Sequence, residues 1–572
     1  MTTATSTTEQ LVRPALRAER AYATPAWPGP IDLRLDANEG PPAIDIAALA
    51  AAMTSQEAAR YPSARDLERE IAAFHAVAPE RVIVTAGADD AIDRLCRATL
   101  EPGASMVTTT PTFEMIARGG RLAGAEVRAV PWLEGDFPTD AVIESADEGT
   151  RMIAVVSPNN PTGAVATSAD LSRLSAACPN AALLVDLAYT EFAAIDLTRA
   201  ALDLPNAVVT RTFSKAYGLA GMRVGYAIGP GSLIQATRAT GGPYPCSGFS
   251  LRAARAALRV PVDVGTVVAR RGRIADSLAR LGTRVIDSQA NFVMASFGGR
   301  TRWVWRALCS LGIKVRAFDE ASGLGEWLRI GVPASDADEA RLLASVQTAL
   351  APAALLFDMD GVLADVSRSY RRAIVDTAAS FGVGVTPEDI ERAKARGNAN
   401  NDWMLTRDLL ASRGVEVSLA RVTERFQALY LGTPGSPGFE AAESLIPDAS
   451  LLRRLARRMP LAVVTGRPRE ECRRFLDRFG IADLFRACVC MEDAAPKPSP
   501  DPVRLALRRL GLDTAWMFGD TPDDAAAARG GGVVPIGFLG PACNSERARA
   551  ALVNAGVAEV LSDLEQLARL LP

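Results

Sequence analysis

The stretch Arg211-Thr-Phe-Ser-Lys-Ala-Tyr-Gly-Leu-Ala-Gly-Met-Arg223 follows a short β-type run and carries one of the rarest residue types in the chain. Only four of the 63 basic residues are lysines, which leaves 59 arginines, so arginine supplies the ordinary surface charge. Arginine cannot form an imine with an aldehyde because its guanidinium stays protonated, whereas a lysine amine can lose its proton. We therefore interpret Lys215 as a reactive amine rather than as a surface charge.

Short apolar runs around this stretch predict an α/β fold. They alternate with helical patterns, and the expected strands are residues 82–85, 105–109, 152–156, 183–186, 208–210 and 224–228. This alternation is typical of a mostly parallel sheet covered by helices on both faces. Residues 250–350 are predicted to form a smaller α/β region with one long helix over 251–281 and two later strands. A new buried strand at 354–357 begins a second α/β unit.

The bulk composition excludes several classes of protein. At 572 residues the chain exceeds the size of a single core. The net charge of −3 gives no argument for a nucleic acid or a membrane as partner. The first 22 residues contain no apolar signal segment, and no apolar run reaches the roughly 18 residues that span a bilayer. We therefore expect a cytoplasmic protein with scattered, reduced cysteines, and its single histidine, His75, is expected to be structural.

Polar residues follow directly after several predicted strands, where open α/β sheets place their ligands. The turn over 87–90 opens a helix and could bind a phosphate, although such a turn can also serve only as a helix cap. Phe113 could stack on a planar ligand or pack in the core. Asn160 stands in a rigid turn, and Asp186 ends a buried strand, where its carboxylate needs a cationic partner. With Tyr189 and Lys215, these residues describe one ligand that has an aromatic ring, a protonatable nitrogen, a phenolic oxygen, a phosphate and an aldehyde: pyridoxal phosphate.

In this order, over about residues 30–350, the motifs resemble those of the fold-type I aminotransferases, most closely the histidinol-phosphate aminotransferases. The resemblance rests on Leu35-Asp-Ala-Asn38-Glu39, Arg60-Tyr61-Pro62, Gly87-Ala-Asp-Asp90, Pro111-Thr-Phe113, Asn159-Asn-Pro-Thr-Gly163, Asp186-Leu-Ala-Tyr189, Arg211-Thr-Phe-Ser-Lys215, Ala290-Asn-Phe292 and Trp327-Leu-Arg329. It implies a homodimer whose substrates are small molecules, with glutamate or 2-oxoglutarate as one of them.

The resemblance also implies a role for each matching residue. Lys215 would form the imine with the cofactor and then move a proton on the substrate, and Asp186 would keep the ring nitrogen protonated. Asn160 and Tyr189 would bind the phenolic oxygen. The cofactor phosphate and ring would be held by Ala88, Asp89, Phe113, Ser214 and Arg223, with Tyr61 supplied by a partner subunit. The substrate would be bound by Arg329, a planar fork suited to an anion, and by Asn38.

Three positions depart from the pattern of the histidinol-phosphate aminotransferases. That family usually has a tyrosine where Phe113 stands, commonly an acidic residue where Leu187 stands, and a second asparagine where Gly40 stands. These departures leave the cofactor chemistry in place. They leave open how an imidazole group would be recognised.

A second set of strand-end residues begins at Asp358 and Asp360, which follow a buried apolar run. Two carboxylates at the end of one strand are costly without a cation. Thr465, Lys497 and Asp520 follow later runs in order, and the set resembles the four motifs of the haloacid dehalogenase superfamily of phosphohydrolases over residues 353–572.

This second resemblance makes Asp358 the nucleophile that accepts the phosphoryl group and Asp360 the general acid and base. Thr465 and Lys497 would neutralise the phosphoryl oxygens. Mg²⁺ would be bound by Asp358, by Asp360 through its carbonyl, and by Asp520. Asp524 would steady Lys497 or the metal. The mostly helical residues between the first and second motifs, about 367–459, would form a cap over the site. Within this cap, residues 397–402 would form either a substrate-facing loop or only a helix-capping turn.

We therefore predict a flexible arm over 1–29, an aminotransferase over 30–350 and a phosphohydrolase over 351–572. The aminotransferase would have a large domain over about 76–250 and a small domain from 30–75 and 251–350. The phosphohydrolase would have a core from 353–366 and 460–572 and a cap over about 367–459.

The predicted function is bifunctional. Transamination of imidazole acetol phosphate would give histidinol phosphate, and hydrolysis would then give histidinol, although this fusion argument is associational. The alternative keeps both chemistries on another phosphorylated keto compound of specialised metabolism. A third hypothesis makes one domain a non-catalytic binder, but it predicts decay of a catalytic position, and all of these positions are in place.

Overall fold

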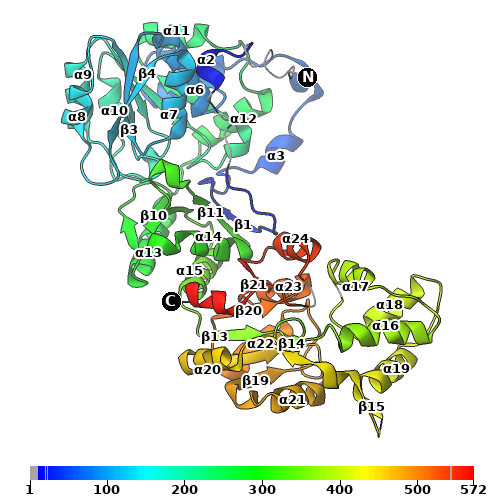
Figure 1. Cartoon of the computed structure of the whole chain (residues 1–572). Coiled ribbons are helices and arrows are strands. Elements are labelled where there is room, and N and C mark those ends of the chain that lie inside the picture. The colour runs from blue at the N-terminus through cyan, green and yellow to red at the C-terminus, as the bar shows by residue number, and fades with distance from the viewer. Residues whose placement is uncertain are drawn as a thin grey trace, which may run out of the picture. The chain divides into compact units, whose positions relative to one another are not determined.

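The computed structural model describes residues 11–17, 19, 21, 24–397, 399–433, 435–541 and 544–571 (Figure 1). Most of the first 23 residues of the predicted N-terminal arm lie outside these ranges. The chain forms two compact units. The first contains residues 1–24, 35–298 and 316–339, and the second contains residues 25–34, 299–315 and 340–572.

The larger sheet of the first unit has seven strands in the order β2-β8-β7-β6-β5-β3-β4. Only β8 is antiparallel to its neighbours β2 and β7. The bounds are β2 Val82–Thr85, β3 Ser105–Thr110, β4 Glu126–Pro131, β5 Thr150–Val156, β6 Ala182–Asp186, β7 Ala207–Thr212 and β8 Gly225–Ile228. The six predicted strands are confirmed. The edge strand β4 was not predicted because only one of its residues, Val130, is buried, so it lacks an apolar run.

Helices cover both faces of this sheet, as predicted. Alternate residues of one strand point to opposite faces, so Val84 and Ile83 belong to different apolar clusters. The Ile83 face is covered by α6 Ala88–Thr99, α7 Glu114–Ala123 and α11 Gly231–Ala239. The Val84 face is covered by α5 Arg65–Phe74, α8 Thr139–Glu144, α9 Ser168–Ala177, α10 Thr198–Leu202 and α12 Gly248–Leu258.

The region after residue 250 differs from its prediction. The expected single helix over 251–281 is wrong, because α12 ends at Leu258 and α13 spans Gly265–Arg280. Pro261 lies between them, and its missing N–H and fixed ring do not allow a continuous helix. The expectation of two later strands is also wrong. The described residues form β9 Arg284–Ile286, β10 Phe292–Ser296, β11 Ile313–Ala317 and β12 Trp327–Gly331, which join β1 Leu33–Leu35 in the order β1-β11-β12-β10-β9.

The second unit contains a six-stranded parallel sheet in the order β19-β18-β13-β20-β21-β22. Its strands are β13 Ala354–Phe357, β18 Leu461–Val464, β19 Phe485–Val489, β20 Ala515–Gly519, β21 Val534–Phe538 and β22 Val560–Leu561. The helices of this core are α20 Ala449–Arg458, α21 Arg469–Arg478, α22 Asp501–Leu510, α23 Pro522–Gly530 and α24 Glu546–Ala555. The predicted strand starting at Ala354 is therefore confirmed as a central strand of a new sheet.

A helical insert leaves and re-enters this core through a two-stranded ribbon. The ribbon pairs β14 Ala364–Asp365 with β17 Ser444–Leu445. Between these strands lie α16 Tyr370–Ser380, α17 Pro387–Lys394, α18 Asp402–Ala411 and α19 Leu419–Leu431. We call the helical part of this insert, α16 to α19, the cap.

The second unit also contains helices that precede β13 in the chain, namely α14 Thr301–Ser310 and most of α15 Asp336–Leu350. The ring of Trp303 on α14 packs on that of Trp516 on β20, with centroids 4.6 Å apart. The indole N–H of Trp516, which is fully buried, donates to Thr348 O at 2.8 Å. These helices therefore form part of the core of the second unit.

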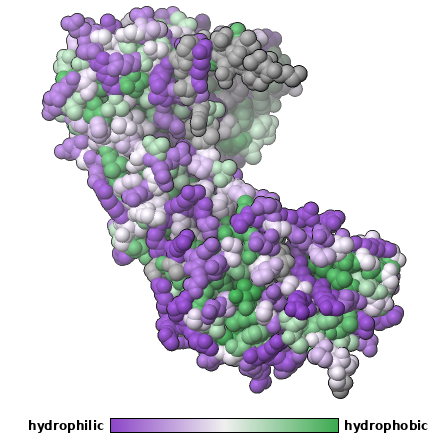
Figure 2. Space-filling view, viewed as in Figure 1, coloured by the Kyte–Doolittle hydropathy of each residue, from purple (hydrophilic) through white to green (hydrophobic). Residues whose placement is uncertain are grey.

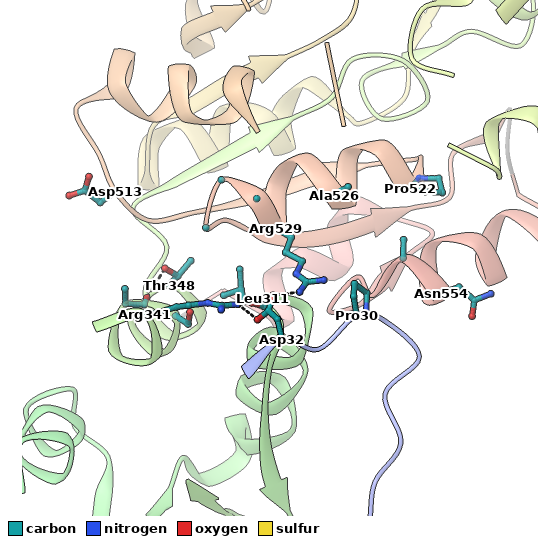
Figure 3. Close-up of a pocket in the computed structure, with 16 residues that line it drawn as sticks. Pro30, Asp32, Leu311, Arg341, Thr348, Asp513, Pro522, Ala526, Arg529 and Asn554 are labelled. Carbon is teal, nitrogen blue, oxygen red and sulfur yellow. Dashed lines mark hydrogen bonds and ion pairs between the residues drawn. The ribbon is translucent and has the colours of Figure 1, made fainter. Parts of the chain in front are cut away.

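A groove of about 880 Å³ lies in this unit (Figure 3). Arg341 and Arg529 both reach the carboxylate of Asp32 there, at 2.6 and 2.5 Å. The lining residues include none of the predicted site residues, so the groove is not part of either predicted site.

Surface charge is largely supplied by arginine, as the composition indicates. Hydrophilic residues cover much of the face shown in Figure 2. Helical ion pairs such as Arg97–Asp93 and Arg199–Asp203 are exposed on both sides of the pair. Among the described residues, no helix combines the length and the hydrophobicity that crossing a membrane requires.

Candidate active sites

Lys215 lies in the loop after β7. Its amine donates to Ala37 O at 2.8 Å and lies 5.6 Å from the centroid of the Tyr189 ring. Lys215 is only partly buried.

Asp186 is the last residue of β6 and is 3% exposed. Burial raises its pKa to about 7, against the effect of a hydrogen bond that Thr210 Oγ1 donates at 3.0 Å. No arginine or lysine of the described chain forms an ion pair with it. A carboxylate that is buried in this way fits a cationic ring nitrogen, which would supply the missing positive charge.

Four further predicted residues are linked by hydrogen bonds. Asn38 Nδ2 donates to the hydroxyl of Tyr189 at 3.0 Å. The guanidinium of Arg329 donates to Asn160 Oδ1 and, at 2.7 Å, to Asp36 O. Residues from four separate parts of the sequence, at 36–38, 160, 189 and 329, therefore lie near the ends of the strands.

The expected phosphate position lies where α6 begins. Gly87, which precedes this helix, has a φ of 89° and its helix start has no side-chain cap, so the first N–H groups of the helix remain available to an anion. A Cβ atom at Gly87 would lie 2.8 Å from Arg223 Nη2. Arg223 also pairs with Asp89 at 3.2 Å. The hydroxyl of Ser214 is buried and has no hydrogen-bond partner in the described structure.

Two predicted cofactor contacts are not linked to this group by any described contact. Phe113 precedes α7 and packs against the apolar cluster that contains Ile92. Tyr61 is 83% exposed and stacks on Tyr244, with ring centroids 4.7 Å apart. The roles of these two side chains remain predictions.

The residues fit pyridoxal phosphate. The unpartnered Ser214 hydroxyl and the uncapped helix start suit its phosphate, and the buried Asp186 suits its ring nitrogen. Lys215, whose amine lies 5.6 Å from the centroid of the Tyr189 ring, would hold its aldehyde.

In the second unit, Asp358 follows β13 and is 4% exposed. Lys497 Nζ donates to Asp358 Oδ1 at 2.7 Å, to Val464 O at 3.2 Å and to Asp524 Oδ1. Burial raises the pKa of Asp358 well above its usual value, although Lys497 opposes this. The predicted association of Lys497 with Asp524 is thus present in the structure.

The carboxylates of Asp358, Asp520 and Asp524 can hold a cation together, since their oxygens lie within 4.8 Å of one another. Burial, and then Asp524, raise the pKa of Asp520 to about 7. Gly361 has a φ of 78°, and a Cβ atom there would lie 2.3 Å from Asp520 Oδ2. A hard divalent cation such as Mg²⁺ prefers this all-oxygen donor set, so the residues fit the metal implied by the sequence.

The side chain of Asp360 is held away from this carboxylate cluster. Arg467 Nε donates to Asp360 Oδ1 at 2.6 Å. Arg467 N also donates to Thr465 Oγ1 at 3.1 Å. This contact engages only the side chain of Asp360, and its contribution to the metal through the carbonyl remains a prediction.

The sequence interpretation missed charged residues of the cap. Lys394 forms an ion pair with Asp402 at 3.1 Å. Burial lowers the pKa of Lys394, but the nearby Asp402, and also Asp520 and Asp360, raise it above its usual value. The rarity of lysine was a signal that could have identified Lys394.

The loop that follows Lys394 reaches the loops of the core that carry the predicted phosphatase residues. Ala399 N donates to Asp523 at 3.0 Å. A Cβ atom at Gly466 would lie 2.9 Å from Asn400 O. Residues 399 and 400 therefore lie against loops of the predicted phosphatase site, and residue 398 lies outside the described residues.

Both sites lie at strand ends of sheets that match known families. Residues 31–346 match the family described as aminotransferase class I and II, and residues 352–532 match the haloacid dehalogenase-like hydrolases. The first match covers more than half of the chain, which therefore belongs to the class I and II aminotransferase family and carries a haloacid dehalogenase-like hydrolase domain after it.

Individual relatives refine this assignment. The chain is 37% identical over 275 residues to a histidinol-phosphate aminotransferase of Cereibacter sphaeroides, which is 46% of this chain and 76% of that protein. It is 51% identical over 196 residues to an imidazoleglycerol-phosphate dehydratase of Phytophthora nicotianae; this is 33% of the chain and 43% of that protein, less than half of its length. The fold is similar to the structure of a histidinol-phosphate aminotransferase from Sinorhizobium meliloti in complex with pyridoxal-5'-phosphate, with a TM-score of 0.52 and 24% identity over 59% of this chain and 96% of that one.

Proposed function

We propose that the protein is a bifunctional enzyme. Its first unit would transfer an amino group from glutamate to a phosphorylated ketone of the imidazole acetol phosphate type. Its second unit would hydrolyse the phosphate ester of the product and release histidinol. The observation that carries this proposal is the presence of two strand-end sites in one chain, one built on Lys215 and Asp186 and the other on Asp358 and Lys497.

The proposed aminotransferase chemistry uses residues that already lie together. Pyridoxal phosphate, when bound, supplies the electron sink that makes the substrate Cα–H acidic. Lys215 would hold its aldehyde in the resting enzyme and would move the proton on the substrate. Asp186 would keep a positive charge on the ring nitrogen, since a buried carboxylate is stabilised by such a partner. Arg329 would bind the carboxylate or phosphate of the substrate.

The proposed phosphatase chemistry is a two-step phosphoryl transfer. Asp358 would attack phosphorus, and the bond from phosphorus to the ester oxygen would break while Asp360 gives that oxygen a proton. Water, deprotonated by Asp360, would then attack the phosphorus. The bond between phosphorus and Asp358 would break, which releases inorganic phosphate. Lys497 would offset the negative charge at Asp358, and Asp358 and Asp520 would bind the Mg²⁺ that neutralises the phosphoryl oxygens.

The histidine-related substrate is favoured by the relatives. The aminotransferase relative and the dehydratase relative are both named for phosphate esters of the histidine route. The first matches this chain over 275 residues and the second over 196 residues. Consecutive steps on one phosphorylated compound would give a reason for joining the two activities, although such an argument rests on analogy.

A two-substrate assay tests the proposal. The protein receives imidazole acetol phosphate and glutamate, and 2-oxoglutarate and inorganic phosphate are measured. We expect both products from the wild type, only 2-oxoglutarate from Asp358→Asn, and neither from Lys215→Ala. The matched control is histidinol phosphate, from which Lys215→Ala should still release phosphate. If the wild type leaves histidinol phosphate unchanged, the histidine assignment is wrong.

The cofactor is tested separately. The wild type with pyridoxal phosphate should show the near-visible absorption of a lysine imine, and Lys215→Ala should lack it. Persistence of this band in Lys215→Ala would exclude Lys215 as the attachment site.

A second candidate is the same pair of reactions on another phosphorylated keto compound. It is favoured by Leu187, which is fully buried in the apolar cluster of the sheet, where the related enzymes commonly carry an acid. Gly40 and Phe113 also depart from that family. Comparing kcat/KM for phosphorylated ketones with and without an imidazole ring decides between the two: a clear preference for a compound without the ring would favour this candidate.

We also propose that the first unit forms a homodimer that brings Tyr61 to the cofactor phosphate of the partner subunit. Support comes from the exposure of the stacked Tyr61 and Tyr244 and from the shallow groove beside them, which Phe249 and Met53 also line. Light scattering should give twice the chain mass. Tyr61→Phe should weaken cofactor binding without changing this mass, whereas a monomeric wild type would refute the proposal.

A further inference from the structure

Arg467 is the largest charged side chain that is fully buried in the second unit. It follows β18 in the loop that also carries Thr465, and its side chain has no exposed area. A guanidinium is rarely buried unless acidic groups and acceptors surround it. Its position therefore requires an explanation from its contacts.

Its donors are shared between the catalytic core and the insert. Arg467 Nε donates to Asp360 Oδ1 at 2.6 Å. Nη2 donates to Glu443 Oε1 at 2.9 Å, and Nη1 donates to Glu443 Oε2 at 3.1 Å and to the Tyr430 hydroxyl at 3.1 Å. The guanidinium carbon also lies 4.6 Å from the centroid of the Tyr370 ring. One side chain thus joins the predicted acid and base, Asp360, to three residues of the insert.

These three residues lie close to both segments that connect the cap to the core. Tyr370 is the first residue of α16, a few residues after β14, so it marks the outgoing segment. Tyr430 belongs to α19, and Glu443 directly precedes β17, so they mark the return. Ser369 Oγ also donates to Glu443 Oε1 at 2.8 Å, which links the two segments. A displacement of the cap would therefore change the surroundings of the Arg467 guanidinium.

The charge and the shape of Arg467 suit this task. Burial by itself lowers its pKa, but Asp360 and Glu443 raise it well above the usual value, so the guanidinium stays charged. Its planar fork can serve Glu443 with two donors while Nε serves Asp360, which the single ammonium of a lysine cannot reproduce.

We propose that Arg467 is a positioning residue that orients the Asp360 carboxylate and, through Glu443 and Tyr430, makes this orientation depend on the placement of the cap. The proposal rests on the proposed function of Asp360 as acid and base. Because its side chain has no exposed area, Arg467 would act through Asp360 rather than on the phosphate ester itself. Its effect is to fix Asp360 while Glu443 and Tyr430 hold the guanidinium.

The proposal makes a prediction that a merely structural role does not make. An alkyl ester such as histidinol phosphate needs a proton on its leaving oxygen, whereas the nitrophenolate of p-nitrophenyl phosphate leaves without one. Misplacing Asp360 should therefore slow the first step on the alkyl ester far more than on the aryl ester. A shift of about 1 Å in a catalytic group can cost roughly a hundredfold in rate.

The experiment uses the full-length protein with Mg²⁺ and the variants Arg467→Lys and Glu443→Gln. First-turnover rates are measured for both esters, because Asp360 also acts in the second step of turnover. Arg467→Lys should lose about a hundredfold on histidinol phosphate and less than about tenfold on p-nitrophenyl phosphate. Glu443→Gln keeps one acceptor oxygen and should show the same selectivity with a smaller loss.

The matched control is Arg474→Lys on α21, where an exposed arginine pairs with Glu440; it should leave both rates unchanged. Equal losses on the two esters, or no loss in Arg467→Lys, would overturn the proposal. If Arg467→Lys lacks the thermal transition of the second unit, Glu443→Gln decides by the same criterion. A wild type that hydrolyses neither ester would instead refute the proposed phosphatase function, and this inference with it.

Discussion

Replacing Asp186 by asparagine should stabilise the cofactor-free first unit, and the gain should grow with pH. Asparagine has nearly the shape of a protonated aspartate but cannot ionise. In the wild type, burial raises the pKa of Asp186 from 3.8 to about 7. The folded state therefore binds this proton more tightly than the unfolded chain does.

The direction and size of the effect follow from these two pKa values. Well below its unfolded-state pKa of 3.8 the carboxyl is protonated in both states, and it costs the fold nothing. As pH rises from about 4 to about 7, the unfolded chain loses the proton first, so the wild type loses stability. A difference of about three pH units corresponds to roughly 4 kcal/mol at about 1.4 kcal/mol per unit. Asp186→Asn should thus equal the wild type near about pH 3 and exceed it by up to about 4 kcal/mol near about pH 8.

Hydrogen exchange of the β6 amides measures the free energy of unfolding of the first unit alone. Wild type and Asp186→Asn are compared at each pH, so that the contributions of all other titrating groups cancel in the difference. Adding pyridoxal phosphate should make the wild type more stable than Asp186→Asn, because the ring nitrogen gives the wild-type carboxylate a positive partner. A stability difference that is independent of pH would refute the proposed state of Asp186.

Three further predictions concern single contacts. Gly361→Ala should lower phosphatase activity by roughly a hundredfold, since its Cβ would lie 2.3 Å from Asp520 Oδ2, and aminotransferase activity of the same sample is the control. Lys497→Met should destabilise the second unit by about 3–5 kcal/mol in urea unfolding, because it leaves two buried carboxylates without their cation, and adding Asp524→Asn should recover part of this loss. Ser214→Ala should weaken binding of pyridoxal phosphate by about tenfold to a hundredfold in a fluorescence titration. The stability of the cofactor-free protein should stay unchanged, because the Ser214 hydroxyl has no hydrogen-bond partner in the cofactor-free structure. An unaltered affinity would show that Ser214 does not bind the phosphate.

The strand ends could be predicted from the sequence because their signals are local. A buried run that stops at a carboxylate identifies both the strand and the need for a cation, as at Asp186 and Asp358. The signal for the helix break after Leu258 was equally local, because Pro261 is incompatible with a continuous helix. One long helix was expected only because the apolar pattern continues on both sides of this proline.

Contacts between distant parts of the chain could not be predicted in this way. Asp360 and Arg467 are 107 residues apart, and nothing in the residues around either one selects the other among the many arginines and acids. Asn38 and Tyr189 are 151 residues apart and meet only because separate segments fold to the same strand ends. Such pairs depend on the complete fold rather than on a pattern.

The packing of Trp516 also limits how the two activities can be separated. A fragment that starts at residue 352, where the hydrolase family begins to match, would lack both Trp303 and the Thr348 carbonyl that accepts the buried indole N–H. It would expose a tryptophan face to water and tend to aggregate. The two family domains therefore cannot be separated at the point where one family match ends and the other begins. A hydrolase fragment would need α14 and α15 to complete its core, and an aminotransferase fragment without them would lack two helices that belong to its own family match.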